Sequence, residues 1–163
     1  MEFVFNYSTI KTKTINSTAA ESDVDIVISE ENNFDRKTII EITEDGTVTC
    51  VVLFWSHFSD DAEPSLFWIE DERILFLGAG YVSAVVNIAT KDVIDINYPD
   101  LFWGWESING NILELGELNC RLYSPAGDII GSAPVDPPYD YNATESAISF
   151  SSIVMGVTSI EIK

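Results

Sequence analysis

Turn residues divide this chain into many short apolar segments, and no window of a dozen residues keeps the period of a helix. The segments are rich in Val, Ile, Thr, Phe and Trp, which favour β-strands. We therefore expect an all-β fold with little helix, and the one short helical candidate lies at residues 17–22. The expected strands cover residues 2–7, 10–15, 24–29, 38–43, 47–55, 65–70, 73–78, 81–88, 92–97, 101–106, 111–116, 118–124, 128–133, 146–152 and 157–162.

A first hairpin is predicted around residues 44–46, Glu-Asp-Gly. A two-residue Asp-Gly loop would place Ile42 opposite Thr49, which mixes apolar and polar residues on one face. A three-residue loop with Gly46 in the left-handed region aligns Ile42 with Val48 and gives one apolar face. We therefore expect the three-residue loop.

A second hairpin is predicted around residues 124–128, Ser-Pro-Ala-Gly-Asp. Proline presets the first turn residue, and glycine accepts the positive φ that such a turn needs. Leu122-Tyr123 should therefore pair with Ile129-Ile130.

A faint internal repeat organises the middle of the chain. Residues 73–78 are echoed by residues 111–116, with an offset that runs from 38 residues (Ile74 to Ile112) to 36 (Val93 to Ile129). Units of this length, here about 65–100 and 102–138, are similar to the blades of β-propellers. We expect a single domain over 1–163, built as a half-propeller-like stack of antiparallel hairpins. The alternative is a β-sandwich or an irregular barrel.

The net charge is strongly negative and unevenly distributed. The chain has 27 acidic residues against 8 Lys and Arg, a net charge of −19, and residues 21–100 contribute −14 of it, with 18 acidic and 4 basic residues. Such a surface repels nucleic acid and anionic lipid and accelerates encounter with a basic protein. The N-terminus has no basic segment followed by an apolar one, and no apolar run has membrane-spanning length, so we expect a cytoplasmic protein.

Few residues offer catalytic chemistry. His57 is the only histidine, so a multi-histidine zinc site is excluded, and a catalytic triad would need this one ring. Cys50 and Cys120 are outside any Cys-x-x-Cys pair and are expected to be free thiols. Residues 78–80, Gly-Ala-Gly, join two expected strands and so form no phosphate loop, and the acids lack calcium-loop spacing. We expect no metal, no cofactor and no enzymatic activity.

Acidic residues and large aromatic residues are interleaved along the chain. Trp103 and Trp105 should share one face of a strand, with Phe102 on the other. These rings either fill the core between sheets or anchor an interface whose carboxylates receive Lys and Arg from a partner. Residues 137–142 are expected to be a Pro- and Tyr-bearing loop. The expected partner-binding residues are Asp60, Asp61, Glu63, Trp68, Glu70, Asp71, Glu72, Trp105, Glu106, Tyr139, Asp140 and Tyr141.

In its size, charge, expected compartment and lack of a catalytic motif, the chain resembles bacterial immunity proteins. These are acidic inhibitors made beside the toxins of contact-dependent growth inhibition and related polymorphic toxin systems. The resemblance includes no sequence motif. It implies a one-to-one complex with a basic toxin, often a nuclease, whose active-site cleft the acidic and aromatic surface covers.

Two other functions stay open at this point. A hydrolase would use a pair of carboxylates, or His57 as its base. A structural or adaptor subunit would assemble through exposed strand edges.

Overall fold

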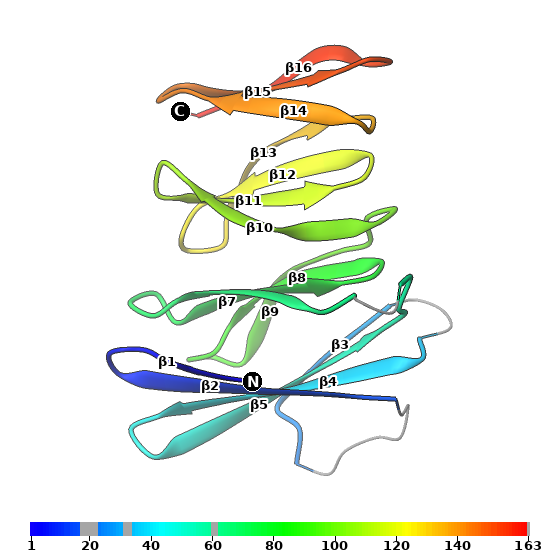
Figure 1. Ribbon diagram of the computed structural model, residues 1–163. Coiled ribbons are helices and arrows are strands. Elements are labelled where there is room, and N and C mark those ends of the chain that lie inside the picture. Colours follow the sequence, from blue (N-terminus) through cyan, green and yellow to red (C-terminus); the bar gives the residue numbers. More distant parts are fainter. Residues whose placement is uncertain (17–22, 31–33, 60–61, 163) are drawn as a thin grey trace.

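Four stacked β-sheets make up the protein (Figure 1), as seen in a computed structural model that describes residues 1–16, 23–30, 34–59 and 62–162. These residues form sixteen strands and no helix. The first sheet has the order β1-β2-β4-β5-β3, in which only β3 pairs in parallel, with β5. Its strands are β1 (Glu2–Val4), β2 (Ser8–Ile15), β3 (Ile26–Ser29), β4 (Arg36–Glu44) and β5 (Thr47–Trp55).

The other three sheets are antiparallel meanders, in which each strand pairs with the next one along the chain. The second sheet contains β6 (Ser65–Ile69), β7 (Ile74–Ala79), β8 (Val82–Asn87) and β9 (Asp92–Asn97). The third contains β10 (Phe102–Ile108), β11 (Asn111–Gly116), β12 (Asn119–Tyr123) and β13 (Ile129–Pro134). The fourth has three strands, β14 (Tyr139–Ala143), β15 (Ala147–Ser152) and β16 (Gly156–Glu161). The fold is a half-propeller-like stack, and the sandwich alternative is wrong.

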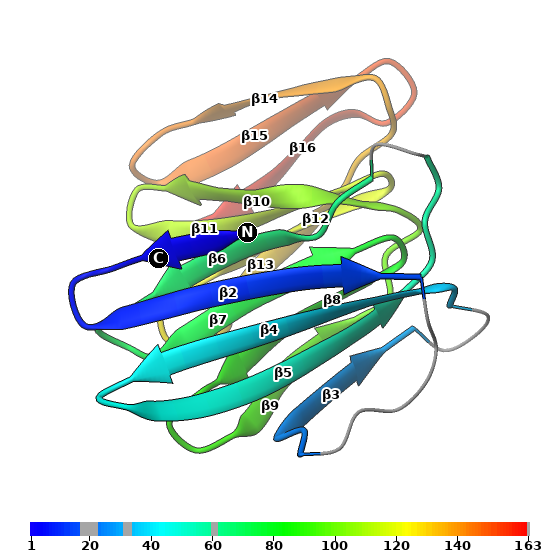
Figure 2. The same cartoon turned by 60° about the horizontal axis from the view of Figure 1, so that its bottom comes forward.

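Three apolar layers fill the spaces between the four sheets. Leu53 of β5 and Leu75 of β7 lie in the first layer, and Figure 2 shows the first sheet lying over the second. Phe76 of β7 belongs to the second layer, and Phe150 of β15 to the third. All residues of β7 are buried, because this strand has a sheet on each side. The sequence of β7 is therefore a continuous apolar run without alternation.

The β4–β5 hairpin has the shorter loop, so the prediction of a three-residue loop was wrong. Glu44 pairs with Thr47, and Ile42 pairs with Thr49. Asp45 and Gly46 have φ values of 49° and 78°, and two positive values form the type I′ turn whose twist matches that of the strands. Thr49 is consequently buried on the inner face.

The second predicted hairpin is confirmed at its first pair. Tyr123 pairs with Ile129, while Leu122 pairs with Gly131, so Ile130 is the extra residue of a β-bulge. Gly127 takes the expected positive φ of 91°. The helical candidate at residues 17–22 lies outside the described residues.

A buried carboxylate links the second and third sheets. Glu114 of β11 accepts hydrogen bonds from the Ser83 hydroxyl of β8 at 2.6 Å and the Asn97 amide of β9 at 2.9 Å. Burial raises the pKa of Glu114. The hydroxyl of Tyr123 carries one proton and lies 3.1 Å from Glu114 and 2.9 Å from Asp95. If Glu114 is protonated, it can donate a hydrogen bond to Tyr123 while Tyr123 donates to Asp95. Each of these three side chains then has a hydrogen-bond partner.

A second buried carboxylate ties the end of β5 to the β7–β8 turn. Glu30 accepts hydrogen bonds from the backbone and hydroxyl of Ser56, at 2.8 and 2.6 Å, and from the backbone of Tyr81 at 2.9 Å. Gly80 makes this approach possible: its φ is +57°, and an added Cβ would lie 2.4 Å from the Ser56 carbonyl oxygen. We call Glu30, Ser56, Gly80 and Tyr81 the Glu30 clamp.

Gly80→Ala should destabilise the protein far more than Gly110→Ala. Both glycines have positive φ, but nothing lies within 4 Å of a Cβ at Gly110. We expect a loss of about 1 kcal/mol for Gly110→Ala, and about 3 kcal/mol for Gly80→Ala because a backbone carbonyl must also move. Urea unfolding measures both losses. Equal losses would show that the Glu30 clamp is not needed for stability.

Glu114→Gln should stabilise the protein increasingly as pH rises. Because the folded-state pKa is raised above its ordinary value of 4.5, the free energy of unfolding of the parent falls as pH rises from that value through the raised one. Glutamine keeps the shape of the neutral acid and lacks this loss. Urea unfolding between pH 4 and pH 8 should show a difference that grows with pH. Glu72→Gln, in an exposed turn, is the control and should change stability by less than about 0.5 kcal/mol throughout.

Candidate functional site

The expected partner-binding residues fall into separate groups. Glu63 precedes β6, whereas residues 70–72 form the turn that follows it. Extended chain advances about 3.3 Å per residue, so Glu63 and Glu70 lie roughly 20 Å apart. Asp60 and Asp61 lie outside the described residues. One continuous cluster of all these acids is therefore not formed.

Two of the expected anchors are core residues. Trp68 is only 9% exposed, faces the first apolar layer and donates to the Ser8 hydroxyl at 3.0 Å. Trp105 is 8% exposed and meets the Phe76 ring edge-on at 5.3 Å between centroids. The prediction that these two rings lie exposed at an interface was wrong, because the layers on either side of the second sheet enclose them.

A β-bulge in β10 changes which rings are exposed. The register shifts between Phe102 and Gly104, so Phe102 and Trp105 both point into the second layer. Trp103 points outward and is 45% exposed. The expected sharing of a face by Trp103 and Trp105 was therefore wrong. The glycine inside the Phe-Trp-Gly-Trp run was the available signal for a bulge.

The exposed Trp103 belongs to a fixed aromatic group. Its ring stacks on Tyr139, with centroids 5.2 Å apart and planes at 3°. The Tyr139 hydroxyl donates to the Gly116 carbonyl at 2.9 Å, and burial raises the pKa of Tyr139. The Tyr141 hydroxyl donates a hydrogen bond to Glu106. Burial is the larger cause, and this hydrogen bond the next, of a pKa of Tyr141 raised to about 12. We call Trp103, Tyr139 and Tyr141 the aromatic ledge.

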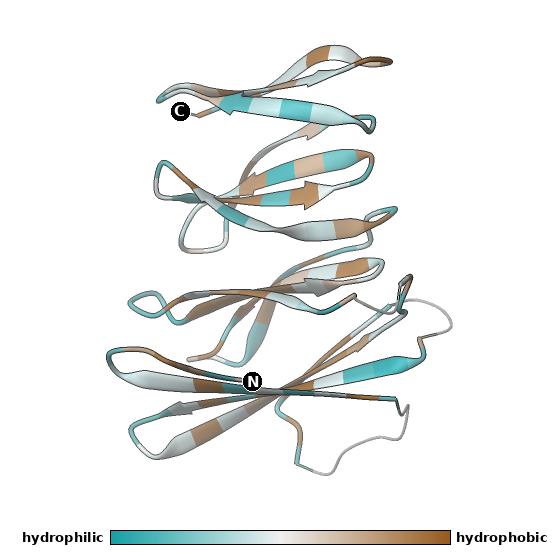
Figure 3. Ribbon diagram, viewed as in Figure 1, coloured by the Kyte–Doolittle hydropathy of each residue, from teal (hydrophilic) through white to brown (hydrophobic). Residues whose placement is uncertain are grey.

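The tyrosines of the ledge are positioned by strand β14, not by the loop expected at residues 137–142. Tyr139 and Tyr141 alternate along the strand and pack against the third layer. Asp140 lies between them on the opposite, exposed face, and β14 is largely hydrophilic in Figure 3. Asp140 is therefore separated from the ledge, whereas Glu106 is part of its surroundings.

A cavity of about 300 Å³ adjoins the ledge. Its aromatic lining residues are Phe58, Phe102 and Trp103, and Glu63 is the one acidic residue among the described lining residues. Phe58 is 49% exposed, and it was not among the expected partner-binding residues. The lining residues are Phe58, Ser59, Ala62, Glu63, Ala79, Gly80, Phe102 and Trp103.

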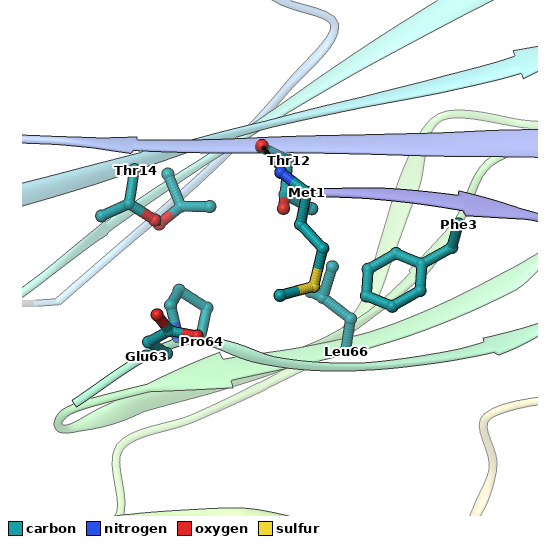
Figure 4. A pocket seen from close by; sticks show the side chains of 8 residues that line it. Met1, Phe3, Thr12, Thr14, Glu63, Pro64 and Leu66 are labelled. Atoms are coloured by element: carbon teal, nitrogen blue, oxygen red, sulfur yellow. Dashed lines mark hydrogen bonds between the residues drawn. The ribbon is translucent and has the colours of Figure 1, made fainter. Parts of the chain in front are cut away.

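Glu63 also lines a second cavity, of about 270 Å³, between the first sheet and the start of β6 (Figure 4). Met1, Phe3 and Leu66 form its apolar part. The hydroxyls of Thr14 and Thr38 lie 2.9 Å apart, and Thr38 also accepts a bond from the Trp55 indole at 3.0 Å. These hydroxyls are engaged with protein groups.

The acidic turn after β6 has a partly structural role. Glu70 accepts hydrogen bonds from the Ser8 hydroxyl at 2.6 Å and the Tyr7 backbone at 2.9 Å, and the first of these chiefly lowers the pKa of Glu70. Arg73 of the same turn pairs with Glu44 at 2.6 Å. Asp71 and Glu72 are exposed in this turn. They are the acids of this group that remain open to a partner.

His57 is paired with one carboxylate. Its ring Nδ1 lies 2.6 Å from Asp35 Oδ2, and its backbone N–H donates to Asp35 Oδ1 at 3.1 Å, which lowers the pKa of Asp35. Among the described residues no hydroxyl or thiol is hydrogen-bonded to this ring. Nor do those residues contain a group of three or more His, Cys, Asp or Glu placed to hold a metal ion. Two parts of a triad are thus present, and the described residues place no nucleophile on this ring.

No protein-family model matches the sequence. The search of curated proteins also finds no similar chain. Among solved structures, 99% of this chain aligns with 42% of BamB from Moraxella catarrhalis, at 12% identity and a TM-score of 0.41. Hsv2 from Kluyvelomyces marxianus aligns over 84% of this chain and 48% of its own, at 9% identity and a TM-score of 0.35.

These likenesses concern the all-β, propeller-type fold alone. This chain spans less than half the length of either matched chain. The described residues contain no helical segment with the length and apolarity needed to cross a membrane.

Replacing each tryptophan of β10 should separate the site from the core. Trp105→Ala empties a space in the second layer and should cost about 3–5 kcal/mol. Trp103→Ala removes a half-exposed ring and should cost about 1 kcal/mol, because only the Tyr139 stack is lost. Chemical denaturation of both variants measures the two losses. A large loss for Trp103→Ala would make this ring a core residue and exclude it from the site.

Proposed function

We propose that this chain is a binding protein that neutralises a basic protein partner, in the manner of a bacterial immunity protein acting on a toxin in the cytoplasm. The proposal rests on one observation: the aromatic ledge, whose Trp103 ring is exposed and stacked on Tyr139, lies beside the Glu63 carboxylate, which is unpaired among the described residues, on a chain of net charge −19. The complex would contain one copy of each protein. The expected partner is a nuclease, and the acidic and aromatic surface would cover the cleft in which that nuclease holds phosphate.

Charge supports this proposal because the described cations are largely engaged. Arg73, Lys91 and Arg121 pair with carboxylates at 2.6, 2.6 and 3.3 Å. The acids far outnumber them, so most of the carboxylates remain uncompensated. An uncompensated acidic surface attracts the Lys and Arg with which a nuclease holds phosphate, and it repels the nucleic acid itself.

The aromatic ledge supports it in a second way. Interfaces depend on a few desolvated anchors, in which Trp and Tyr are enriched. Trp103 and Tyr139 are stacked, and the Tyr139 hydroxyl is already bonded to Gly116. Binding would therefore freeze little additional side-chain motion.

One observation favours a second candidate, a hydrolase: the His57–Asp35 pair, in which a carboxylate orients the imidazole as it would a general base. A nucleophile bonded to the ring is missing among the described residues. His57→Ala decides between the two, since it would abolish hydrolysis but leave partner binding unchanged.

The association rate with the partner should depend steeply on salt. The proposal predicts that the neighbouring gene encodes a basic toxin-like domain; that domain is the probe, and stopped-flow fluorescence measures the rate. Between low and high ionic strength we expect a fall of about 10-fold or more. Glu63→Lys combined with Glu106→Lys, on either side of the ledge, should slow association about 10-fold at low salt and much less at high salt.

Asp92→Lys combined with Asp128→Lys is the matched control. It changes the net charge equally, at exposed positions of β9 and of the β12–β13 turn. We expect less than a threefold effect on the rate. A rate indifferent to salt, or an adjacent gene without a basic domain, would count against the proposal.

A further inference from the structure

The cavity beside the aromatic ledge has the composition of a site for a planar cation. Its two large exposed rings, Phe58 and Trp103, lie on different segments, the β5–β6 connection and β10. Its carboxylate is Glu63, which has no hydrogen-bond or ion-pair partner among the described residues. None of the described lining residues is basic, so within the described part of the chain no cation compensates the negative charge of the cavity.

The indole of Trp103 lines the cavity and also stacks on Tyr139, with planes at 3°, and Tyr139 is not among the described lining residues. The remaining surface of the ring, on a side chain 45% exposed, lines the cavity together with Phe58. A ring whose orientation is fixed by a stacking partner offers a flat, preorganised surface, which is the geometry that attracts a cation or a planar group.

The walls of the cavity are held together by buried polar contacts. The Glu30 clamp fixes Ser56, two residues before Phe58, to the β7–β8 turn. The backbone of Phe102, next to Trp103, donates to the Gly80 carbonyl at 2.8 Å. The two backbone segments that carry Phe58 and Trp103 are thus both tied to the β7–β8 turn.

We infer that this cavity is a slot for one arginine side chain of the partner, an inference that rests on the proposed function. The guanidinium stacks on Trp103, and its N–H groups donate to the Glu63 carboxylate. A volume of about 300 Å³ is at the lower limit for small-molecule sites and suits a single side chain. Lysine, a compact charge without a planar face, fits this pairing of ring and carboxylate less well.

A capped Gly-Arg-Gly peptide is the probe, compared with the same peptide carrying lysine or the neutral isostere citrulline. NMR detects binding through the indole N–H signal of Trp103, and the buried Trp105 serves as internal reference. We expect the arginine peptide to bind about 10-fold more tightly than the citrulline peptide and about threefold more tightly than the lysine peptide.

Two variants test the assignment of the walls. Glu63→Gln should weaken the arginine peptide about 10-fold and remove its advantage over citrulline. Trp103→Ala should abolish the binding of all three peptides. Glu72→Gln, in the turn at the opposite end of β6, is the matched control and should bind as the parent does.

Equal affinity for arginine and citrulline, or a Glu63→Gln variant that binds like the parent, would overturn the slot. Binding of a neutral disaccharide with no response to arginine would also overturn it, and would identify the ledge as a glycan platform. The proposed function is tested by a different result. If the arginine peptide binds but association with the neighbouring gene's domain is independent of salt, the arginine site stands and the inhibitor function is rejected. If association depends on salt but the arginine peptide does not bind, the inhibitor function stands and the arginine site is rejected.

Discussion

Every sheet of this protein depends on its neighbours to cover its apolar faces. A single sheet leaves an apolar face that another element must cover, and the stack meets this need by sharing three apolar layers among four sheets. The two middle sheets are covered on both faces, as the complete burial of β7 illustrates. The order of the sheets along the chain follows from this requirement, since each meander packs on the one formed just before it.

Polar groups then define how neighbouring sheets sit on each other. In the faint repeat, Glu114 of β11 occupies the position of Phe76 in β7, so one unit places a carboxylate where the other places a ring. Phe76 packs on Trp105 and Tyr123, whereas Glu114 bonds to Ser83 and Asn97 of the second sheet. Apolar packing is non-directional, but the hydrogen bonds of Glu114 are not. They specify one register between two sheets that would otherwise slide.

Much of the fold was readable from the sequence because apolar runs bounded by turn residues are a local signal. The run in β7 and its echo in β11 predicted the second strands of two sheets. The errors have specific causes. Preference for one apolar face favoured a longer loop at residues 44–46, but the twist of the strands selected the type I′ turn and buried Thr49. In β10 the bulge changed the alternation on which the placement of Trp103 rested.

The candidate site was harder to predict than the fold, because its parts come from distant segments. Acidity and aromatic content were visible in composition, yet two of the four rings chosen from the sequence, Trp68 and Trp105, are buried, whereas Tyr139 and Tyr141 belong to the ledge. Trp103 and Phe58 gain their roles only when β10 and the β5–β6 connection meet beside the ledge. Whether an acid remains unpaired also depends on residues far away in the sequence. Glu70 accepts a hydrogen bond from Ser8, whereas Glu63 has no such partner among the described residues.

The fourth sheet has three strands, and among the described residues it packs on the third sheet. In a stack whose sheets contact their nearest neighbours, a small sheet that packs on one other sheet opens at a lower free energy than a sheet covered on both faces. Because β14 carries Tyr139 and Tyr141, each opening of this sheet would also remove the support behind Trp103. The lifetime of the ledge thus depends on subglobal opening of the fourth sheet, and a partner that bound the ledge would slow the amide exchange of β14–β16.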